Sequence, residues 1–427
     1  QVIAPALVIS ADQYRPDQAH HHIVVTTTIA PDWLPFLKTA VAIVCEQGGL
    51  ACHGAILARE LGIPAVVGVP GITDDLQTGD QLRLDGDHGT VDRIKASSPQ
   101  SSFPPPPMVG ASPPVQVTVK PTVKSTQATL PSGWDDCQTE LWVNLTQPDR
   151  AISAAAWPIA GVGLLRSEWL ILPCLQQRHP YHWLALGEGE RLQAKLVEQL
   201  RPILAAFFPR PVRYRSLDLR SHELTTLVGG PPPEVNPVLG VRGTFSYQQH
   251  PDLFQLELNA LRILQKQGLT NVQLLLPFVR TVEEFRYCQR QVEATRLDLV
   301  ADFQLWMMAE VPSVLFLLPD YVQAGVEGIA IGSNDLTQLL LGVDRDQAIF
   351  SETFDERHPA VQAAIAQLLQ QAQALDLPTS ICGMAPARYP KIISALVQNG
   401  ITGISVDQPA LAATAAAIAQ AEAERSP

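Results

Sequence analysis

The chain has 427 residues, which is too long for one ordinary hydrophobic core. Hydrophobic residues make up 46% of it and charged residues 17%, a composition that excludes a largely disordered protein. The net charge of −12 argues against a general nucleic-acid binder, and no apolar run reaches the roughly 18–20 residues of a membrane span. The six cysteines form no CxxC pair, so we expect reduced thiols in a cytoplasmic protein rather than a disulfide framework.

One boundary divides the chain into two predicted domains. Residues 96–134 hold nine prolines, and their only charges are Lys120 and Lys124. A segment of this composition cannot bury a core and is typical of a linker. We therefore expect a small domain over residues 1–95 and a large domain over residues 135–427.

The small domain has a readable centre. Residues 41–45 form a buried apolar run, and the double glycine that follows indicates a turn. The spacing predicts a helix over residues 50–61 and a second strand over residues 65–69. His53 then lies in the first turn of the helix, where free N–H groups and the helix dipole favour an anion such as a phosphorylated imidazole. A lone helical histidine is more often a capping or packing residue, and both interpretations stay open here.

The large domain alternates short apolar segments with helical stretches. Eight such βα units predict a (β/α)8 barrel of the TIM type, with a doubly wound open sheet as the alternative. Polar residues fall at or just beyond the ends of these segments, which favours the barrel because barrel enzymes build their sites on that face. The predicted strands span residues 140–145, 161–166, 211–217, 272–279, 304–310, 328–333, 379–384 and 403–407. The polar residues at their ends are Arg166, Arg215, Glu310, Asn334, Asp335, Cys382 and Asp407.

Three arginines, Arg166, Arg215 and Arg242, lie in apolar or glycine-rich segments near predicted strand ends. Phosphate and carboxylate groups suit the fixed fork of donors that arginine supplies, and converging arginines stabilise the charge of a phosphoryl group in transfer. For any one arginine, a surface ion pair is the simpler interpretation. All three arginines lie in similar apolar or glycine-rich segments near strand ends, so a surface ion pair is a weaker explanation for the set than for one arginine alone.

Two acids on different predicted strands form a candidate metal site. Glu310 and Asp335 would supply hard oxygen ligands, which suit Mg²⁺ bound together with substrate oxygens. Asp335 precedes a helical run, so a helix cap is an equally good local interpretation. Cys382 is by itself typical of a small core residue. The histidine run at residues 20–22 could bind a metal, although a solvated loop explains it better.

Residues 48–68 carry the strongest motif, and they closely resemble the swivelling phosphohistidine domain of the phosphoenolpyruvate-utilising enzyme family. The large domain resembles the phosphoenolpyruvate- and pyruvate-binding barrel of the same family, and the likeness extends over nearly all of residues 20–95 and 138–410. Residues 30–38 and 215–223 are most similar to the phosphoenolpyruvate synthase branch.

The resemblance implies a role for each candidate residue. His53 would be phosphorylated in turn, and Cys382 would be the general acid that protonates C3 of the pyruvate enolate, which an ordinary thiol pKa near 8.5 suits. Mg²⁺ would be the cofactor, held by Glu310 and Asp335. The residues implied to contact phosphoenolpyruvate or pyruvate are Arg166, Arg215, Arg242, Glu310, Gly332, Ser333, Asn334 and Asp335.

The full family reaction converts ATP, pyruvate and water into AMP, phosphoenolpyruvate and phosphate. Nothing in the chain resembles the family's ATP-grasp domain, so we expect an upstream segment or a separate chain to supply the ATP chemistry. The first residue is Gln1 rather than Met, which leaves open a trimmed product or a piece of a longer chain. Family members pair through the barrel, which implies a homodimer.

Some positions depart from the family's usual residues. They are Cys45 and Ala51, where Thr is usual, Met384 in place of Gln, and Asp407 in place of Asn. Two alternatives stay open beside a synthase, because the ATP-grasp domain is not found and some family positions differ. One is a phosphotransferase-type donor that passes phosphate to a carrier protein, and the other is a non-catalytic phosphoenolpyruvate-binding regulator derived from a synthase.

Overall fold

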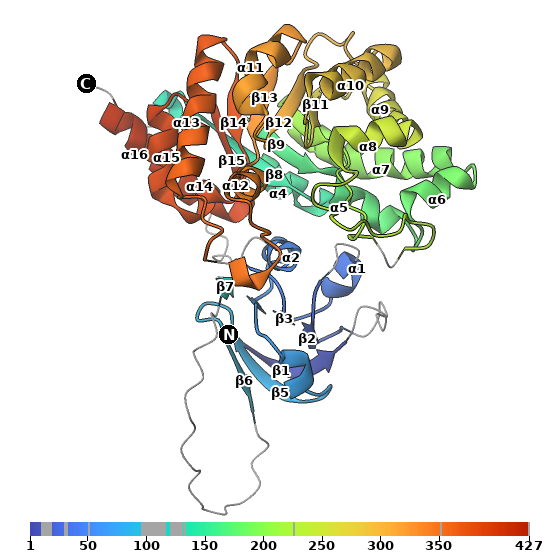
Figure 1. Ribbon diagram of the computed structural model, residues 1–427, viewed down its shortest axis with the longest axis vertical. Coiled ribbons are helices and arrows are strands. Elements are labelled where there is room, and N and C mark those ends of the chain that lie inside the picture. Colours follow the sequence, from blue (N-terminus) through green and yellow to red (C-terminus); the bar gives the residue numbers. More distant parts are fainter. Residues whose placement is uncertain are drawn as a thin grey trace, which may run out of the picture. The chain divides into compact units, whose positions relative to one another are not determined.

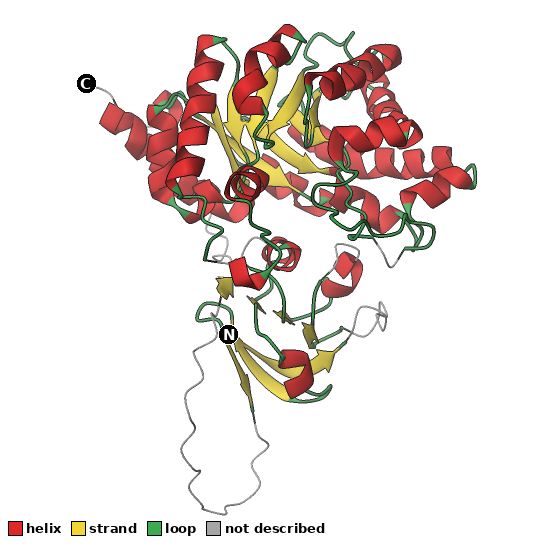
Figure 2. Ribbon diagram, viewed as in Figure 1, coloured by secondary structure: helices red, strands yellow, loops and turns green. Residues whose placement is uncertain are grey.

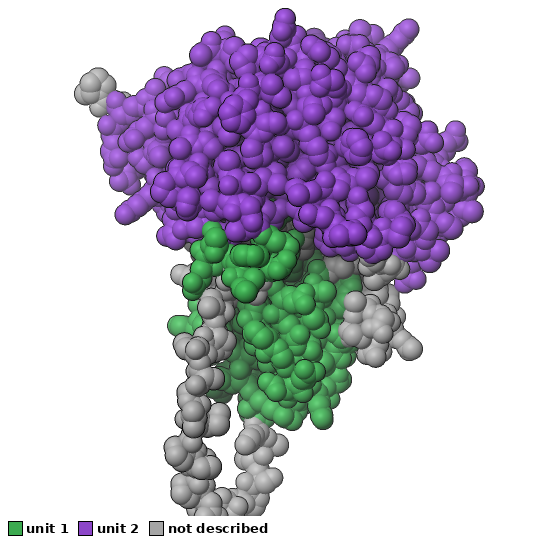
Figure 3. Space-filling model, in the orientation of Figure 1, with its two compact units in different colours: residues 1–123, 344–353 green, residues 124–343, 354–427 purple. Residues whose placement is uncertain are grey.

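The computed structural model describes residues 1–9, 19–29, 33–49, 52–94, 117–119, 131, 134–224, 227–350 and 352–425. The chain forms two compact units (Figure 3). The first comprises residues 1–123 with 344–353, and the second comprises residues 124–343 with 354–427. Within the described ranges, no helix has both the length and the apolar character needed to cross a membrane.

The first unit is built on a sheet of seven described strands in the order β6-β5-β1-β2-β3-β4-β7 (Figure 1). Strands β1 to β4 run parallel, and β5, β6 and β7 pair antiparallel along the two sides. The strands are β1 Val2–Val8, β2 Ile23–Thr26, β3 Ala42–Cys45, β4 Ala65–Val67, β5 Gln81–Asp85, β6 Thr90–Arg93 and β7 Val117–Val119. The helices are α1 Leu34–Leu37, α2 His53–Leu61 and α3 Ile72–Asp75.

The predicted helix after the double glycine is α2, but it begins three residues later than predicted. Cys52 precedes it in an extended conformation, with φ −69° and ψ 160°, while residues 50 and 51 lie outside the described residues. The helix ends at Gly62, whose φ of 71° is left-handed and whose N–H bonds to the carbonyls of Ala58 and Arg59. Only glycine adopts that conformation without a steric cost, which explains the sharp stop.

The predicted linker remains largely untested by the structure. Residues 95–116, 120–130, 132 and 133 lie outside the described residues. Val117–Val119, in the middle of the predicted linker, forms β7 and pairs antiparallel with β4. The composition of residues 96–134 gave no sign of this strand. The boundaries of the two domains, residues 1–95 and 135–427, stay a prediction.

The second unit is a closed barrel of eight parallel strands surrounded by helices, which confirms the predicted TIM-type barrel (Figure 2). In chain order the strands are β8 Glu140–Leu145, β9 Gly161–Arg166, β10 Val212–Arg215, β11 Val272–Leu276, β12 Leu305–Ala309, β13 Gly328–Ile331, β14 Thr379–Ile381 and β15 Gly403–Asp407. Its helices are α4 Ala151–Ala155, α5 Ser167–Ile171, α6 Pro180–Ala185, α7 Gly189–Phe207, α8 Gly243–Gln249, α9 Pro251–Lys266, α10 Val282–Thr295, α11 Val314–Gln323, α12 Ser333–Leu341, α13 Pro359–Ala374, α14 Ala385–Arg388, α15 Pro390–Gln398 and α16 Leu411–Arg425.

Five of the predicted strands are too long, mainly at their carboxyl ends. The predicted segment 328–333, for example, ends as a strand at Ile331, and α12 begins at Ser333. The predicted segment 272–279 ends at Leu276, and Phe278 beyond it has a left-handed φ of 48°. These apolar stretches continue past the strand because the loops that follow are also buried.

The barrel interior is filled by side chains rather than open. Leu164, Leu275, Trp306, Met308, Ala330 and Cys382 form one buried cluster. Arg213 lies between two indole rings, with its guanidinium carbon 3.9 Å from the ring centroid of Trp142 and 3.6 Å from that of Trp306. Burial lowers the pKa of Arg213 to about 9, so the side chain stays charged near neutral pH and the two rings compensate part of its lost hydration. The polar site must therefore lie above this packed interior.

Candidate active site at the carboxyl end of the barrel

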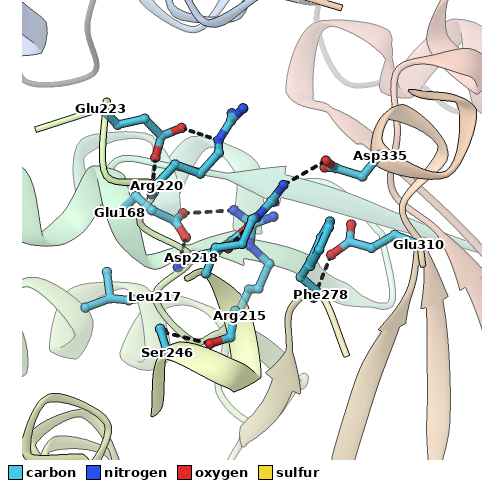
Figure 4. Close-up of polar contacts among 12 residues, drawn as sticks. Glu168, Arg215, Leu217, Asp218, Arg220, Glu223, Ser246, Phe278, Glu310 and Asp335 are labelled. Atoms are coloured by element: carbon cyan, nitrogen blue, oxygen red, sulfur yellow. Dashed lines mark hydrogen bonds and ion pairs between the residues drawn. The ribbon is translucent and has the colours of Figure 1, made fainter. Parts of the chain in front are cut away.

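Two of the predicted arginines end neighbouring strands. Arg166 and Arg215 are the last residues of β9 and β10 and are paired in register. Arg215 Nη2 donates to Glu168 Oε2 at 3.0 Å, and Glu168 Oε1 accepts the N–H of Asp218 at 2.8 Å (Figure 4). Burial alone would lower the pKa of Arg215, but the carboxylates of Glu168, Asp218 and Glu310 outweigh it and raise that pKa. Arg215 is thus a permanently charged, oriented guanidinium.

The third arginine, Arg242, is held between two carboxylates. It precedes α8 and is 2% exposed. Its Nε donates to Asp218 Oδ1 at 3.0 Å, its Nη2 donates to Asp218 Oδ2, and its Nη1 donates to Asp335 Oδ1 at 3.2 Å. The guanidinium carbon also lies 3.9 Å from the ring centroid of Phe278. This clamp fixes the plane of the guanidinium, which is the condition for directional binding of a phosphate or carboxylate.

The loop that carries Arg242 is itself anchored by a fourth arginine. Arg280 donates from Nη2 to the carbonyl of Gly240 at 2.6 Å and from Nη1 to the carbonyl of Arg242 at 3.1 Å. Burial lowers the pKa of Arg280, and the nearby charge of Arg242 adds to that effect. Arg280 therefore places a second positive charge behind the Arg242 backbone.

The two predicted metal-binding acids lie close enough to affect one another. Glu310 follows β12 and is 1% exposed, and its Oε1 accepts the N–H of Phe278 at 2.8 Å. Burial raises the pKa of Glu310, and the charge of Asp335 raises it further. A Cβ at Gly332 would fall 2.3 Å from Glu310 Oε2, so glycine is needed there for the carboxylate to approach. Figure 4 shows Glu310 and Asp335 across from Asp218, Arg215 and Glu168.

The residues around these acids fit a hard cation. Asn334, in the first turn of α12, is 8% exposed, and its Oδ1 accepts no hydrogen bond from any described residue. Two buried carboxylates and an unsatisfied amide oxygen form an all-oxygen donor set, which suits Mg²⁺. The described residues contain no group of three or more His, Cys, Asp or Glu side chains placed to hold a metal ion. Substrate oxygens and waters would therefore have to complete the coordination.

Cys382 follows β14 and is part of the barrel core. Its thiol donates to the carbonyl of Ile331 at 3.7 Å, and the residue is 3% exposed. Burial, aided by Glu310, raises the pKa of Cys382 to about 12, although Arg215, Arg166 and Arg213 act in the opposite direction. The sequence argument used an ordinary thiol pKa near 8.5, and the pKa of Cys382 in the structure is higher because the thiol is buried. Cys382 is therefore a protonated donor at neutral pH.

The departure at Asp407 is accommodated by a neighbouring strand. Asp407 ends β15, and its Oδ1 accepts from Asn144 Nδ2 at 3.4 Å. The same Nδ2 lies 3.4 Å from the carbonyl oxygen of Cys382, and Ser405 Oγ donates to Asn144 Oδ1 at 2.7 Å. The extra acid is thus tied to the wall of the barrel. Ser333, at the start of α12, similarly donates its hydroxyl to the buried carboxylate of Glu356.

His53 belongs to the first compact unit and is the first residue of α2. Its side chain lies outside the described residues. Of the predicted site residues, the structure gathers Arg166, Arg215, Arg242, Glu310, Gly332, Ser333, Asn334, Asp335 and Cys382 at the carboxyl ends of the barrel strands and the loops that follow.

The sequence analysis gave no role to the acids that orient the arginines. Glu168 and Asp218 both stand within three residues of a predicted arginine at a strand end. That position was a usable signal, because any acid just beyond a barrel strand points toward the same face. The anchoring role of Arg280 carried no such signal, since it depends on a loop 38 and 40 residues away in sequence.

The carboxyl end of the barrel presents clamped arginines and paired buried carboxylates, which suit an anionic ligand bound together with a cation. Comparison with known families agrees. Residues 122–423 match the family described as PEP-utilising enzyme, PEP-binding domain, and residues 18–89 match PEP-utilising enzyme, mobile domain. The chain therefore belongs to the phosphoenolpyruvate-utilising enzymes.

Within that family, the chain is similar to proteins named phosphoenolpyruvate synthase. It is 37% identical to a probable phosphoenolpyruvate synthase of Staphylothermus marinus, with 94% of this chain and 48% of that protein covered. It is 36% identical to the phosphoenolpyruvate synthase of Aeropyrum pernix, covering 91% and 47%, and 33% identical to that of Helicobacter pylori, covering 94% and 50%. The chain spans about half the length of these curated relatives.

Proposed function

We propose that the chain carries the pyruvate half of the phosphoenolpyruvate synthase reaction, in which a phosphoryl group passes between His53 and pyruvate. The observation that carries the proposal is the clamped pair Arg215 and Arg242 beside the buried acids Glu310 and Asp335. Such a site suits a substrate that brings both a phosphate and a carboxylate to buried, oriented charges.

Three arginines would hold the substrate. Arg166 and Arg215 approach from adjacent strands, and Arg242 approaches from the loop before α8. Among the described residues, Arg215 Nε has no hydrogen-bond partner, although it is buried. An unpaired buried donor of this kind is costly unless a ligand satisfies it, so we assign this N–H to a phosphate oxygen.

Glu310 and Asp335 would hold Mg²⁺, with Asn334 beside them. When bound, the ion would stabilise the enolate oxygen of pyruvate as the bond to phosphorus breaks. The first turn of α12, with Gly332 before it and Ser333, Asn334 and Asp335 within it, would place backbone N–H groups at the substrate.

In the direction of pyruvate formation, the bond between phosphorus and the enolate oxygen breaks, and a bond between phosphorus and an imidazole nitrogen of His53 forms. The enolate then takes the thiol proton of Cys382 at C3, and the thiolate recovers a proton from solvent. A thiol whose pKa is raised to about 12 stays protonated at neutral pH until the enolate forms. The nearby arginines Arg166 and Arg215 compensate the thiolate while it lasts.

We assign the ATP-dependent charging of His53 to a part that this chain does not contain, either in an upstream segment or in a separate chain. The relatives are about twice as long as the matched region, which leaves room for such a part. The names of these relatives favour a synthase over a phosphotransferase-type donor. The complete set of arginines, acids and thiol favours an enzyme over a non-catalytic regulator.

The test is transfer of label from phosphoenolpyruvate to His53 in the presence of Mg²⁺ and without ATP. The chain should gain an acid-labile, base-stable phosphate, and His53→Ala should gain none. His88→Ala is the matched control, because His88 is an exposed histidine in the same unit and should label normally. A wild-type chain that binds phosphoenolpyruvate without gaining label would favour the regulator instead.

A further inference from the structure

Glu257 is a buried carboxyl that the proposed reaction does not use. It lies in the second turn of α9 and is 0% exposed. Its Oε1 accepts the hydroxyl of Tyr214 at 2.7 Å and the N–H of Leu217 at 2.9 Å. Tyr214 lies just before the segment from Arg215 to Asp218, which we call the turn after β10, and Leu217 lies within it. One oxygen of Glu257 therefore ties the start and the interior of this turn to α9.

The same turn is held a second time by α8. The hydroxyl of Tyr247 donates to the carbonyl of Leu217 at 2.7 Å, and its oxygen lies 2.8 Å from Ser216 Oγ. Tyr247 in turn stacks on Phe254 of α9, with ring centroids 4.2 Å apart. Both backbone groups of Leu217 are thus satisfied by helix side chains. The positions of Arg215 and Asp218 consequently depend on where α9 holds the turn.

The groups that face Glu257 offer no positive charge. The titratable groups that act on it or on its neighbours are Tyr214 on β10, Tyr247 on α8, Glu168 on α5, Asp218 beyond β10 and Cys288 on α10. Tyr181 of α6 instead contacts His250 at the start of α9, with ring centroids 4.1 Å apart and the rings tilted by 34°. The buried residues of α7 are all apolar, and α10 presents Cys288 and Glu284, the latter bonded to Thr244.

The second oxygen of Glu257 has no partner. Within the described ranges, Oε2 is buried and makes no hydrogen bond, and Glu257 forms no ion pair with a described cation. A carboxylate in this position would be an uncompensated charge in an apolar environment, which is strongly unfavourable. A proton on Oε2 removes that charge and leaves Oε1 as the acceptor for both hydrogen bonds.

We propose that Glu257 is a positioning residue for substrate binding, and that it holds the turn from Arg215 to Asp218 as an uncharged carboxylic acid. The inference rests on the proposed function, since it assigns Arg215 to the phosphate. Burial raises the pKa of Glu257 to about 8, and the charge of Glu168 adds to it, while the bonds from Tyr214 and Leu217 act in the opposite direction. This shift agrees with the geometry.

The charge state is tested without any ligand. The folded pKa lies above the ordinary value of 4.5, so the stability that Glu257 contributes is complete below about 4.5 and is lost as the pH rises toward about 8. Glu257→Gln keeps the acceptor and cannot ionise. The urea midpoint of the wild type should therefore fall relative to Glu257→Gln between about pH 4.5 and 8. A constant difference between the two proteins over that range would overturn the uncharged state.

The positioning role is tested by calorimetry of phosphoenolpyruvate binding with Mg²⁺. Glu257→Ala should raise Kd roughly tenfold, since it leaves the Leu217 N–H and the Tyr214 hydroxyl unpaired, whereas Glu257→Gln should stay within about twofold of the wild type. Gln265→Ala is the matched control, because Gln265 is a buried polar residue of α9 whose amide donates to the carbonyl of Leu297, away from the turn. It should lower stability and leave Kd unchanged.

A second comparison applies if Glu257→Ala does not fold. Between about pH 7 and 9, the Kd of the wild type should rise relative to that of Glu257→Gln, because only the wild type gains a buried charge. If Glu257→Ala binds phosphoenolpyruvate with the wild-type Kd, and the Kd of the wild type also follows that of Glu257→Gln between about pH 7 and 9, the positioning role alone is overturned. A wild type that fails to bind phosphoenolpyruvate at any pH would overturn the proposed function and the positioning role together. The urea midpoints of the wild type and Glu257→Gln would still show whether Glu257 is uncharged.

Discussion

Removing the carboxylate of Asp218 should be more harmful than removing a surface acid, because Asp218 clamps a buried arginine. The side chains of Arg242 and Asp218 are only 2% and 4% exposed, so solvent cannot replace the lost partner. Breaking a buried pair by removing one member costs about 3–5 kcal/mol. Asp218→Ala should lie near the lower limit, at about 3 kcal/mol, because Arg242 keeps its contact with Asp335 at 3.2 Å.

A double-mutant cycle separates the clamp from general disruption of the fold. Arg242→Met leaves Asp218, Asp335 and Glu310 without their common cation and should cost about 4–5 kcal/mol. The double variant Asp218→Ala/Arg242→Met should be less destabilised than the sum of the single changes by about 2–3 kcal/mol. Glu188→Ala is a suitable control, since its pairs with Arg178 and Arg191 are partly exposed to solvent and each should contribute less than about 1 kcal/mol.

The assay is urea unfolding followed by tryptophan fluorescence, together with calorimetry of phosphoenolpyruvate binding. Six of the seven tryptophans lie between residues 134 and 306, so the signal reports mainly on the barrel. Asp218→Ala should also raise the Kd for phosphoenolpyruvate by roughly ten- to a hundredfold, because the freed guanidinium no longer holds one orientation. Additive single changes, or an Asp218→Ala protein with wild-type affinity, would refute the clamp.

Two further predictions concern the proposed chemistry. Cys382→Ser should stop the incorporation of solvent deuterium into C3 of pyruvate, while His53 still gains label from phosphoenolpyruvate. A variant that incorporates deuterium at the normal rate would mean that Cys382 has only a structural role. Wild-type binding of oxalate and phosphoenolpyruvate should require Mg²⁺ or Mn²⁺, and Glu310→Ala and Asp335→Ala should each weaken the binding measured with metal present. Calorimetric titrations with and without the metal check this, and metal-independent binding by the wild type would contradict the assigned ligands.

The sequence predicted the barrel because parallel strands buried on both sides are continuous apolar runs. Val272–Leu276 and Leu305–Ala309 are examples, and every residue in both strands is buried. The carboxyl ends were harder to predict, since apolar residues such as Phe278 and Val279 continue into loops that pack against the site. Hydrophobicity marks burial, and it does not distinguish a strand from a buried loop.

The candidate site was predictable in its donors and acceptors but not in what orients them. Arg215 and Glu310 stood out as polar residues at the ends of apolar runs. Glu257 did not, because a glutamate inside a helical segment is typical of a solvated face, and its partner Leu217 is 40 residues away. The raised pKa of Cys382 was likewise not predictable, since the burial that causes it comes from several separate strands.

The balance of charge at the barrel mouth explains why the substrate and the cation should enter together. Arg215 forms an ion pair with Glu168, and Arg242 forms one with Asp218, so both guanidinium groups are oriented before the substrate binds. The charge of Asp335 disfavours the charged form of Glu310. A phosphorylated carboxylate alone would add negative charge beside these two acids. A divalent cation would reverse that repulsion, so the affinity for each ligand should depend on the presence of the other.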